Sequence, residues 1–179
     1  IKIKEKVFVL GDQYNTIKNF LGKINFVIQK PQLGTGHAVK TAKKKIKSLE
    51  SIVLISYADT PFVNFKTFNK LIREVNKETP IAILGFISEN PSGYGRIIKD
   101  DSENVIKIIE ERDASKDILD LKLCNSGIMA VEGKKLFQYL DKIEVSKNGE
   151  YYLTDIVEIC SQNNKKVKLV LGSEDEFFG

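Results

Sequence analysis

Two short runs of consecutive apolar residues constrain the fold of this chain most strongly. Residues 52–55 are all apolar, and residues 80–87 contain no charged or hydrogen-bonding side chain. Because successive residues of a strand point to opposite faces of a sheet, a strand without alternation is covered on both faces. The runs therefore predict buried strands of an α/β fold, with the strand at 52–55 in a central position.

The rest of the chain alternates between short apolar runs and segments of helical spacing. The expected strands are 6–10, 24–28, 95–99, 104–110, 121–131 and 166–171; the expected helices are 15–21, 38–49, 64–76, 134–140 and 151–162. Strands and helices alternate in the first half, and a hairpin at 95–110 follows. This order predicts a three-layer α/β/α sandwich with a mostly parallel, Rossmann-like sheet and a small β-rich insertion.

The bulk composition excludes several classes of protein. The 179 residues, 42% of them hydrophobic, suit one domain spanning 1–179. The net charge is only +4 and the lysines are spread along the chain, so no nucleic-acid partner is implied. No apolar run is long enough to span a membrane. Cys124 and Cys160 fit neither a disulfide framework nor a zinc site, so we expect reduced core residues in the cytoplasm.

A glycine-rich turn at 29–38 leaves one predicted strand and enters a predicted helix. Gly34 and Gly36 let the backbone approach a ligand, and the helix N-terminus behind them offers free amides to oxygen atoms. An ordinary connecting turn explains the same residues, because single glycine-rich loops are common.

A carboxylate follows the apolar run at 52–55. Ligands of open α/β sheets bind beyond the carboxyl ends of the strands, which suits Asp59 to hold Mg²⁺ through oxygen. An ionised carboxylate after a buried strand is costly unless something pairs with it. The alternative is an aspartate that caps a turn ahead of Pro61.

Three further segments carry candidate binding residues. The loop at 91–96 has glycines on both sides of Tyr94 and can lie against a sugar or a base, although a β-turn has the same composition. The charged residues at 110–113 look like solvated surface when taken alone. Asn125 and Gly127 interrupt an apolar strand, which predicts a bulge or the close approach of a ligand.

Taken together, in this order and spacing, these segments resemble the nucleotidyltransferase domain of bacterial N-acetylglucosamine-1-phosphate uridyltransferases over essentially the whole chain. The matching stretches are 32–38, 57–59, 91–97, 110–114, 125–128 and 149–155. The Glu-Tyr-Tyr-Leu-Thr-Asp sequence at 150–155 helps to separate this family from other sugar nucleotidyltransferases.

The resemblance implies an enzyme that forms UDP-N-acetylglucosamine and pyrophosphate from UTP and N-acetylglucosamine 1-phosphate, for peptidoglycan and lipopolysaccharide precursors. By matching position, the uracil would contact Gln29, Gly34 and Thr35, and Asp59 would bind the Mg²⁺ that bridges the phosphates. The N-acetylglucosamine pocket would be lined by Tyr57, Ala58, Gly95, Glu110 and Asn125, with Tyr152 and Thr154 nearby.

The chain departs from the family pattern in three places. The family's glycine-rich loop and its lysine would precede Ile1, and an asparagine of its metal site would follow Gly179. Ala58 stands where the family usually has glycine. We therefore expect little catalysis from these 179 residues alone and activity from a longer gene product, whose C-terminal acetyltransferase domain would make it a homotrimer. The alternatives are another sugar-1-phosphate nucleotidyltransferase and a non-catalytic module that binds nucleotide sugars.

Overall fold

Strand β4 (Ile81–Ile87) is the most deeply buried strand of the protein, as its sequence predicts. The computed structural model describes residues 2–177, so the predicted domain 1–179 extends slightly beyond it at both ends. Side chains at 81 and 83 face one core cluster, while those at 82, 84 and 86 face the other. Apolar residues therefore fill both faces of this strand.

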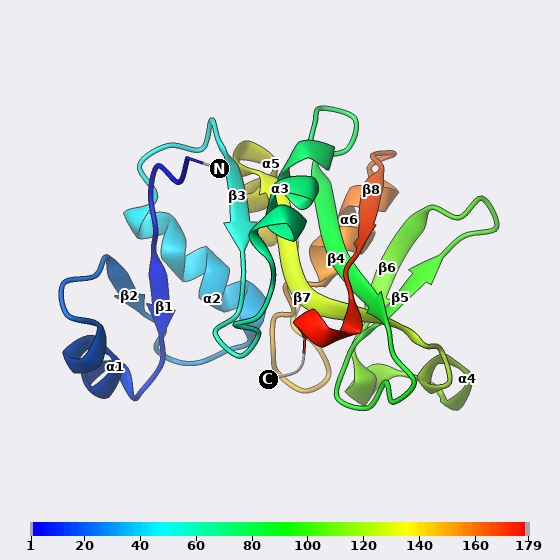
Figure 1. Cartoon of the computed structure of the whole chain (residues 1–179), viewed down its shortest axis with the longest axis horizontal. Coiled ribbons are helices and arrows are strands. Elements are labelled where there is room, and N and C mark those ends of the chain that lie inside the picture. The colour runs from blue at the N-terminus through cyan, green and yellow to red at the C-terminus, as the bar shows by residue number, and fades with distance from the viewer. Residues whose placement is uncertain (1, 178–179) are drawn as a thin grey trace.

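A six-stranded sheet surrounds β4 (Figure 1). Its strands are β3 (Ile52–Ile55), β5 (Arg96–Lys99), β6 (Val105–Ile109), β7 (Leu123–Glu132) and β8 (Val167–Leu171) together with β4. They pair in the order β6-β5-β7-β4-β8, and β3 also pairs with β7. Strands β3, β4, β5 and β8 share one direction, whereas β6 and β7 run against them. Strands β4 and β8 form a parallel pair, and the pairs that involve β6 or β7 are antiparallel.

The position of β3 differs from the prediction. Among the described residues β7 is its one partner, so β3 is not a central strand. Its side chains are less buried than those of β4, and Ile52 is exposed. The reason is that the antiparallel strand β7 lies between β3 and β4, a pairing between segments far apart in the sequence.

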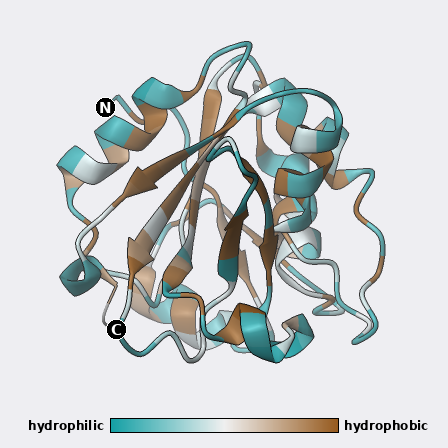
Figure 2. Ribbon diagram, turned by 90° about the vertical axis from the view of Figure 1, so that its right-hand side faces the viewer, coloured by the Kyte–Doolittle hydropathy of each residue, from teal (hydrophilic) through white to brown (hydrophobic). Residues whose placement is uncertain are grey.

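Helices cover both faces of the large sheet, which confirms the predicted α/β sandwich. Helix α3 (Phe65–Glu74) places the fully buried Leu71 against one face. Helices α5 (Gly133–Leu140) and α6 (Asp155–Gln162) pack on the other face. Figure 2 shows the hydrophobic strands enclosed between helices with hydrophilic outer surfaces. Each helix thus buries an apolar stripe and exposes its polar side.

A separate two-stranded parallel sheet forms the N-terminal part of the protein. Strands β1 (Phe8–Leu10) and β2 (Phe26–Ile28) pair with each other, and α1 (Tyr14–Leu21) connects them. Helix α2 (Thr35–Ala42) contacts both strands of this pair and also α5 (Figure 1). It therefore joins the N-terminal pair to the helices that cover the large sheet.

Two predicted helices have different bounds in the structure. The helix predicted at 38–49 is α2 followed by a short 3-10 helix, η1 (Lys43–Lys45), and Ile46 is already extended. Ile46 and Leu49 still pack on the core, so their apolar character reflects packing rather than helical periodicity. The helix predicted at 151–162 begins only at Asp155, because the backbone before it is paired with another segment.

The predicted β hairpin is confirmed as β5 and β6, which extend the large sheet. The predicted bulge is confirmed as well, since the register between β4 and β7 shifts beside Gly127. Three short helices were not predicted: η2 (Glu111–Asp113), α4 (Lys116–Leu119) and η3 (Glu174–Glu176). No helix within the described residues has the length and apolar character needed to cross a membrane.

Candidate functional site

Most of the predicted site residues gather at one edge of the large sheet, beyond the carboxyl end of β3. Tyr57 follows β3 and packs its ring against Gly127 of β7. A Cβ at Gly127 would lie 2.3 Å from Tyr57 Cε2, and the φ of Gly127 is +79°. Only glycine fits both requirements without strain. The bulge in β7 therefore creates the space that the ring of Tyr57 occupies.

The segment 149–154 crosses this edge and holds the glycine-rich turn. Tyr151 donates its N–H to the Leu33 carbonyl at 2.9 Å and accepts from the Gly36 N–H at 2.8 Å. A Cβ at Gly34 would lie 2.7 Å from the Tyr151 carbonyl oxygen, and one at Gly36 would lie 3.0 Å from it. The two glycines thus admit a neighbouring backbone, a role that the sequence alone did not reveal.

Thr35 links this segment to the end of β3. Its hydroxyl oxygen accepts the Leu153 N–H at 2.9 Å. Burial raises the pKa of Tyr57 to about 12, and the negative charges of Glu110 and Asp59 act in the same direction, while a hydrogen bond from Thr35 opposes them. Tyr57 therefore remains a neutral phenol at physiological pH and can donate a hydrogen bond.

A second group of predicted residues surrounds the carboxylate of Glu110. Thr154 donates its hydroxyl to Glu110 Oε1 at 2.7 Å. A Cβ at Gly95 would lie 3.3 Å from Glu110 Oε2, so the loop backbone passes close to the carboxylate. Asn125 donates its N–H to the Gly95 carbonyl at 2.8 Å. The four residues belong to different segments and form one polar cluster.

The side chain of Asn125 is the most informative polar group in this cluster. It is 7% exposed, and its Oδ1 has no hydrogen-bond partner within the described part of the chain. A buried amide oxygen without a donor costs about 1–3 kcal/mol. A bound molecule with a hydroxyl or an N–H group would supply the missing donor.

The buried side chain of Arg96 holds the loop 91–95 in place. The side chain is 1% exposed and donates to the carbonyls of Tyr94 and Leu119, the latter at 3.0 Å. Its Nε has no partner within residues 2–177. The guanidinium group thereby ties the loop that carries Gly95 to the end of α4, which fixes one wall of the cluster.

Gln29 lies at the end of β2, beside the turn at 34–36. It is 8% exposed, and its Nε2 donates to the Gly34 carbonyl at 2.9 Å. The same nitrogen lies 3.1 Å from Nδ1 of His37, the single histidine of the chain. His37 was not among the predicted site residues, although its place in the turn 29–38 was a signal that could have identified it.

Three predicted residues lie at the margin of this arrangement. Ala58 and Asp59 are exposed. The cost of burying an ionised carboxylate therefore gives no support for a metal at Asp59, because water solvates it. Tyr152 is half-buried and its hydroxyl accepts from Asn148 Nδ2 at 3.1 Å, away from the Glu110 cluster. No group of three or more metal-binding side chains occurs among residues 2–177.

Asp155 adds a titratable group beside the Glu110 cluster. Burial, followed by the charges of Glu110, Glu158 and Asp113, raises the pKa of Asp155 to about 6. A carboxylate with a raised pKa in the folded state binds its proton more tightly there than in the unfolded chain. Its contribution to stability is therefore fully present below its ordinary pKa and is lost as the pH rises to about 6.

We expect Asp155→Asn to remove this loss of stability. Solvent screens the charge at this half-buried site, and the helix dipole stabilises it. We therefore expect the gain in the free energy of unfolding to be only about 1 kcal/mol. This corresponds to a melting temperature about 2–4 °C higher than wild type at pH 7.5. When thermal unfolding is measured from pH 4 to 7.5, the melting temperatures of the variant and the wild type should diverge between pH 4 and 6.

Asp117→Asn is the matched control, because Asp117 is an exposed aspartate near the start of a helix. The melting temperature of Asp117→Asn should equal that of the wild type at every pH. If the melting temperature of Asp155→Asn also equals that of the wild type, ionisation of Asp155 does not lower the stability of the folded protein.

Comparisons with known proteins agree with this fold. A family described as nucleotidyl transferase matches residues 1–174. A solved structure of UDP-glucose pyrophosphorylase in complex with UDP-glucose superimposes with a TM-score of 0.64 at 19% identity. The superposition covers 88% of this chain and 62% of the other. At this identity the likeness concerns the fold alone.

Several curated proteins are similar along nearly the whole chain. The bifunctional protein GlmU of Caldanaerobacter subterraneus is 41% identical over 98% of this chain, and that of Caldicellulosiruptor saccharolyticus is 40% identical over 96%. GlmU of Streptococcus thermophilus is 37% identical over 93% of it. The matched regions cover 39%, 38% and 37% of the three relatives, so the chain spans about two fifths of their length.

Proposed function

The chain belongs to the nucleotidyl transferase family, and we propose that the protein carrying it is an N-acetylglucosamine-1-phosphate uridyltransferase. The reaction joins UTP to N-acetylglucosamine 1-phosphate and yields UDP-N-acetylglucosamine and pyrophosphate. Support comes from the motifs described above and from relatives that carry the name GlmU.

The observation that carries this proposal is the buried, unpartnered Oδ1 of Asn125 beside Glu110. Together they offer two acceptors, and the neutral hydroxyl of Tyr57 offers a donor. An N-acetylated sugar presents hydroxyls and an amide, so it can bind to both kinds of group. We therefore assign this cluster to the sugar and include Gly95, whose backbone passes close to the Glu110 carboxylate.

The opposite side of the segment 149–154 is the proposed nucleotide side. Gln29, Gly34 and Thr35 lie there, and the Tyr151 backbone holds their turn rigidly. Thr35 and Thr154 connect the two sides, because the first accepts from Leu153 and the second donates to Glu110. A preorganised frame of this kind fixes the distance between two bound substrates.

The proposed metal is Mg²⁺, held by Asp59. Mg²⁺ in phosphate-transfer sites is commonly bound by one or two carboxylates together with substrate phosphates, so a single exposed carboxylate at the strand end fits. When bound, the ion would polarise the α-phosphate and neutralise charge that develops during the reaction. We assign no other metal ligand within residues 2–177.

The proposed chemistry requires no side-chain nucleophile. An oxygen of the sugar 1-phosphate attacks the α-phosphorus of UTP in line with the bond to the β-phosphate oxygen. That bond breaks and pyrophosphate leaves with its electron pair. The protein's contribution is to hold both substrates in line and to exclude competing geometries.

We extend the proposal to the setting of the enzyme. We infer a cytoplasmic protein, because Cys124 and Cys160 are both buried and form no disulfide with each other. Nucleic acid and membranes are not among the proposed partners. A homotrimer, formed through a domain outside this chain, is the proposed state of the full-length protein.

The test is a pyrophosphate-release assay on the full-length gene product with Mg²⁺. We expect UTP with N-acetylglucosamine 1-phosphate to react at least about tenfold faster than CTP, dTTP or glucose 1-phosphate in the corresponding position, a difference of about 1.4 kcal/mol. Preference for another pair would identify a different sugar nucleotidyltransferase. Binding of UDP-N-acetylglucosamine without turnover would identify a non-catalytic module.

A further inference from the structure

The side-chain amide of Gln29 is held in one orientation by two neighbours. Its Nε2 lies 2.9 Å from the Gly34 carbonyl oxygen, which can only accept a hydrogen bond. The same nitrogen lies 3.1 Å from His37 Nδ1. A flipped amide would place Oε1 against the Gly34 oxygen, two acceptors without a proton between them. The NH₂ group must therefore face the turn.

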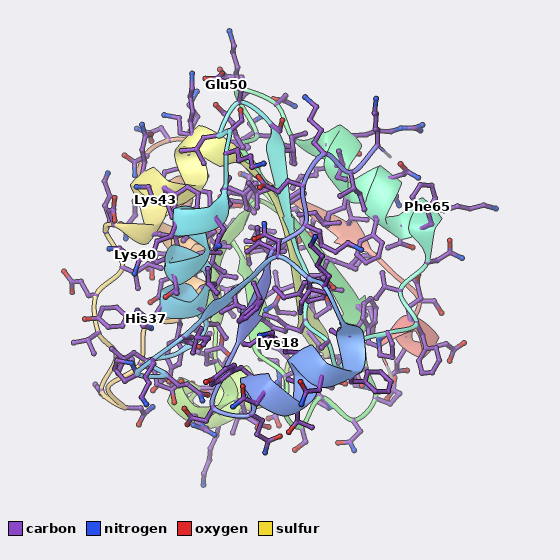
Figure 3. The ribbon with its side chains drawn as sticks, turned by 90° about the vertical axis from the view of Figure 1, so that its left-hand side faces the viewer. Lys18, His37, Lys40, Lys43, Glu50 and Phe65 are labelled. Atoms are coloured by element: carbon purple, nitrogen blue, oxygen red, sulfur yellow. The ribbon has the colours of Figure 1, made fainter. Side chains whose placement is uncertain are left out.

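The second contact fixes the state of the histidine. Both protons of the Gln29 NH₂ group are used when one goes to Gly34 and the other to His37. His37 Nδ1 must then carry no proton, which leaves its proton on Nε2. Figure 3 shows His37 at the beginning of α2, about one turn before Lys40.

These two contacts leave Oε1 as the free end of the Gln29 amide. Within the described part of the chain Oε1 accepts no hydrogen bond, whereas Nε2 is fully engaged. The side chain thus presents an acceptor alone. An acceptor that faces ring position 3 of a pyrimidine can accept a hydrogen bond from the N3–H group of uracil. Cytosine has an acceptor at the same position, so no hydrogen bond forms there and the two acceptors repel each other.

We propose that His37 is a positioning residue that makes the nucleotide site select bases with a ring N–H over cytosine. It does so through Gln29, without touching the base, and the proposal rests on the nucleotide site proposed above. The histidine imidazole is the second of two acceptors that keep the amide from turning. When it is absent, one hydrogen bond alone opposes the flip.

The test compares His37→Leu with His37→Asn in the full-length protein. The leucine removes the acceptor. The asparagine keeps one, because its amide oxygen is one bond from Cγ, as Nδ1 is in histidine. The measured quantity is the ratio of the dissociation constants of CTP and UTP by titration calorimetry, with the corresponding kcat/KM ratio from pyrophosphate release.

We expect the CTP-to-UTP ratio to fall about fivefold in His37→Leu, which is within the range that one neutral hydrogen bond contributes. It should stay within about twofold of wild type in His37→Asn. A loss of packing would weaken both nucleotides alike and leave the ratio unchanged. An unchanged ratio in His37→Leu, or an equal fall in both variants, overturns the inference.

A second measurement separates this inference from the proposed function. In protein labelled with ¹⁵N-histidine, the signal that disappears in His37→Asn belongs to His37, and long-range nitrogen–proton correlations give its tautomer. A proton on Nε2 with a bare Nδ1 supports the positioning role even if the wild-type protein shows no turnover. A proton on Nδ1 refutes it even if the enzyme uses UTP as proposed.

Discussion

Asp59→Asn is expected to reduce Mg²⁺-dependent pyrophosphate release by the full-length protein at least about a hundredfold. Loss of the carboxylate removes the protein's proposed hold on the ion, and stabilisation of phosphoryl charge by a metal contributes several kcal/mol. Each 1.36 kcal/mol corresponds to a factor of about ten in rate. Because Asp59 is exposed, the melting temperature should stay within about 1–2 °C of wild type.

The matched control for this variant is Asp101→Asn, which removes the same charge from an exposed position in the β5–β6 turn. It should keep wild-type activity. The Mg²⁺ concentration that gives half-maximal rate should rise in Asp59→Asn alone. If both variants retain activity equally, Asp59 does not hold the metal, and its role is reduced to ending the turn before Pro61.

Gly34→Ala is expected to destabilise the domain by about 3–5 kcal/mol and to weaken UTP binding. Gly34 has φ +95° and ψ 177°, a region that is essentially restricted to glycine and costs other residues about 1–3 kcal/mol. The added Cβ would also lie 2.7 and 2.9 Å from backbone atoms of Tyr151, and overpacking of this kind costs about 1–3 kcal/mol more. Urea denaturation followed by circular dichroism measures the loss.

Gly22→Ala separates backbone strain from collision in this experiment. Gly22 also has a positive φ, +70°, but a Cβ there meets nothing within 4 Å. Gly22→Ala should lose the backbone strain energy alone, about 1–3 kcal/mol, and bind UTP normally. Equal losses in the two variants would mean that the contact between Gly34 and the segment 149–154 contributes nothing to stability.

The glycine-rich turn shows how a correct motif can have an incomplete explanation. The sequence identified Gly34 and Gly36 as places where the backbone can approach a ligand, with an ordinary connecting turn as the alternative. In the structure a close partner is the backbone at 151, far away in the sequence. A ligand on the opposite side of the turn remains compatible with this packing, and the proposed function relies on it.

Local patterns determined the elements of this protein. The unbroken apolar run of β4 predicts burial on both faces, because side-chain direction alternates along any strand. Spacing in the segment 64–76 predicts helix α3, and the asparagine and glycine inside β7 predict its bulge. These features follow from the chain's own geometry over a few residues, so the sequence contains them directly.

Tertiary pairing decided what local patterns cannot encode. The insertion of β7 between β3 and β4, the start of α6 at Asp155 and the exposure of Asp59 all depend on contacts between distant segments. Leu153 and Thr35, joined by a hydrogen bond, lie 118 residues apart. The orientation of the Gln29 amide depends on Gly34 and His37, which only the folded turn brings together. The resemblance to a known family thus supplied most of the candidate site residues, and the fold set which atoms they present.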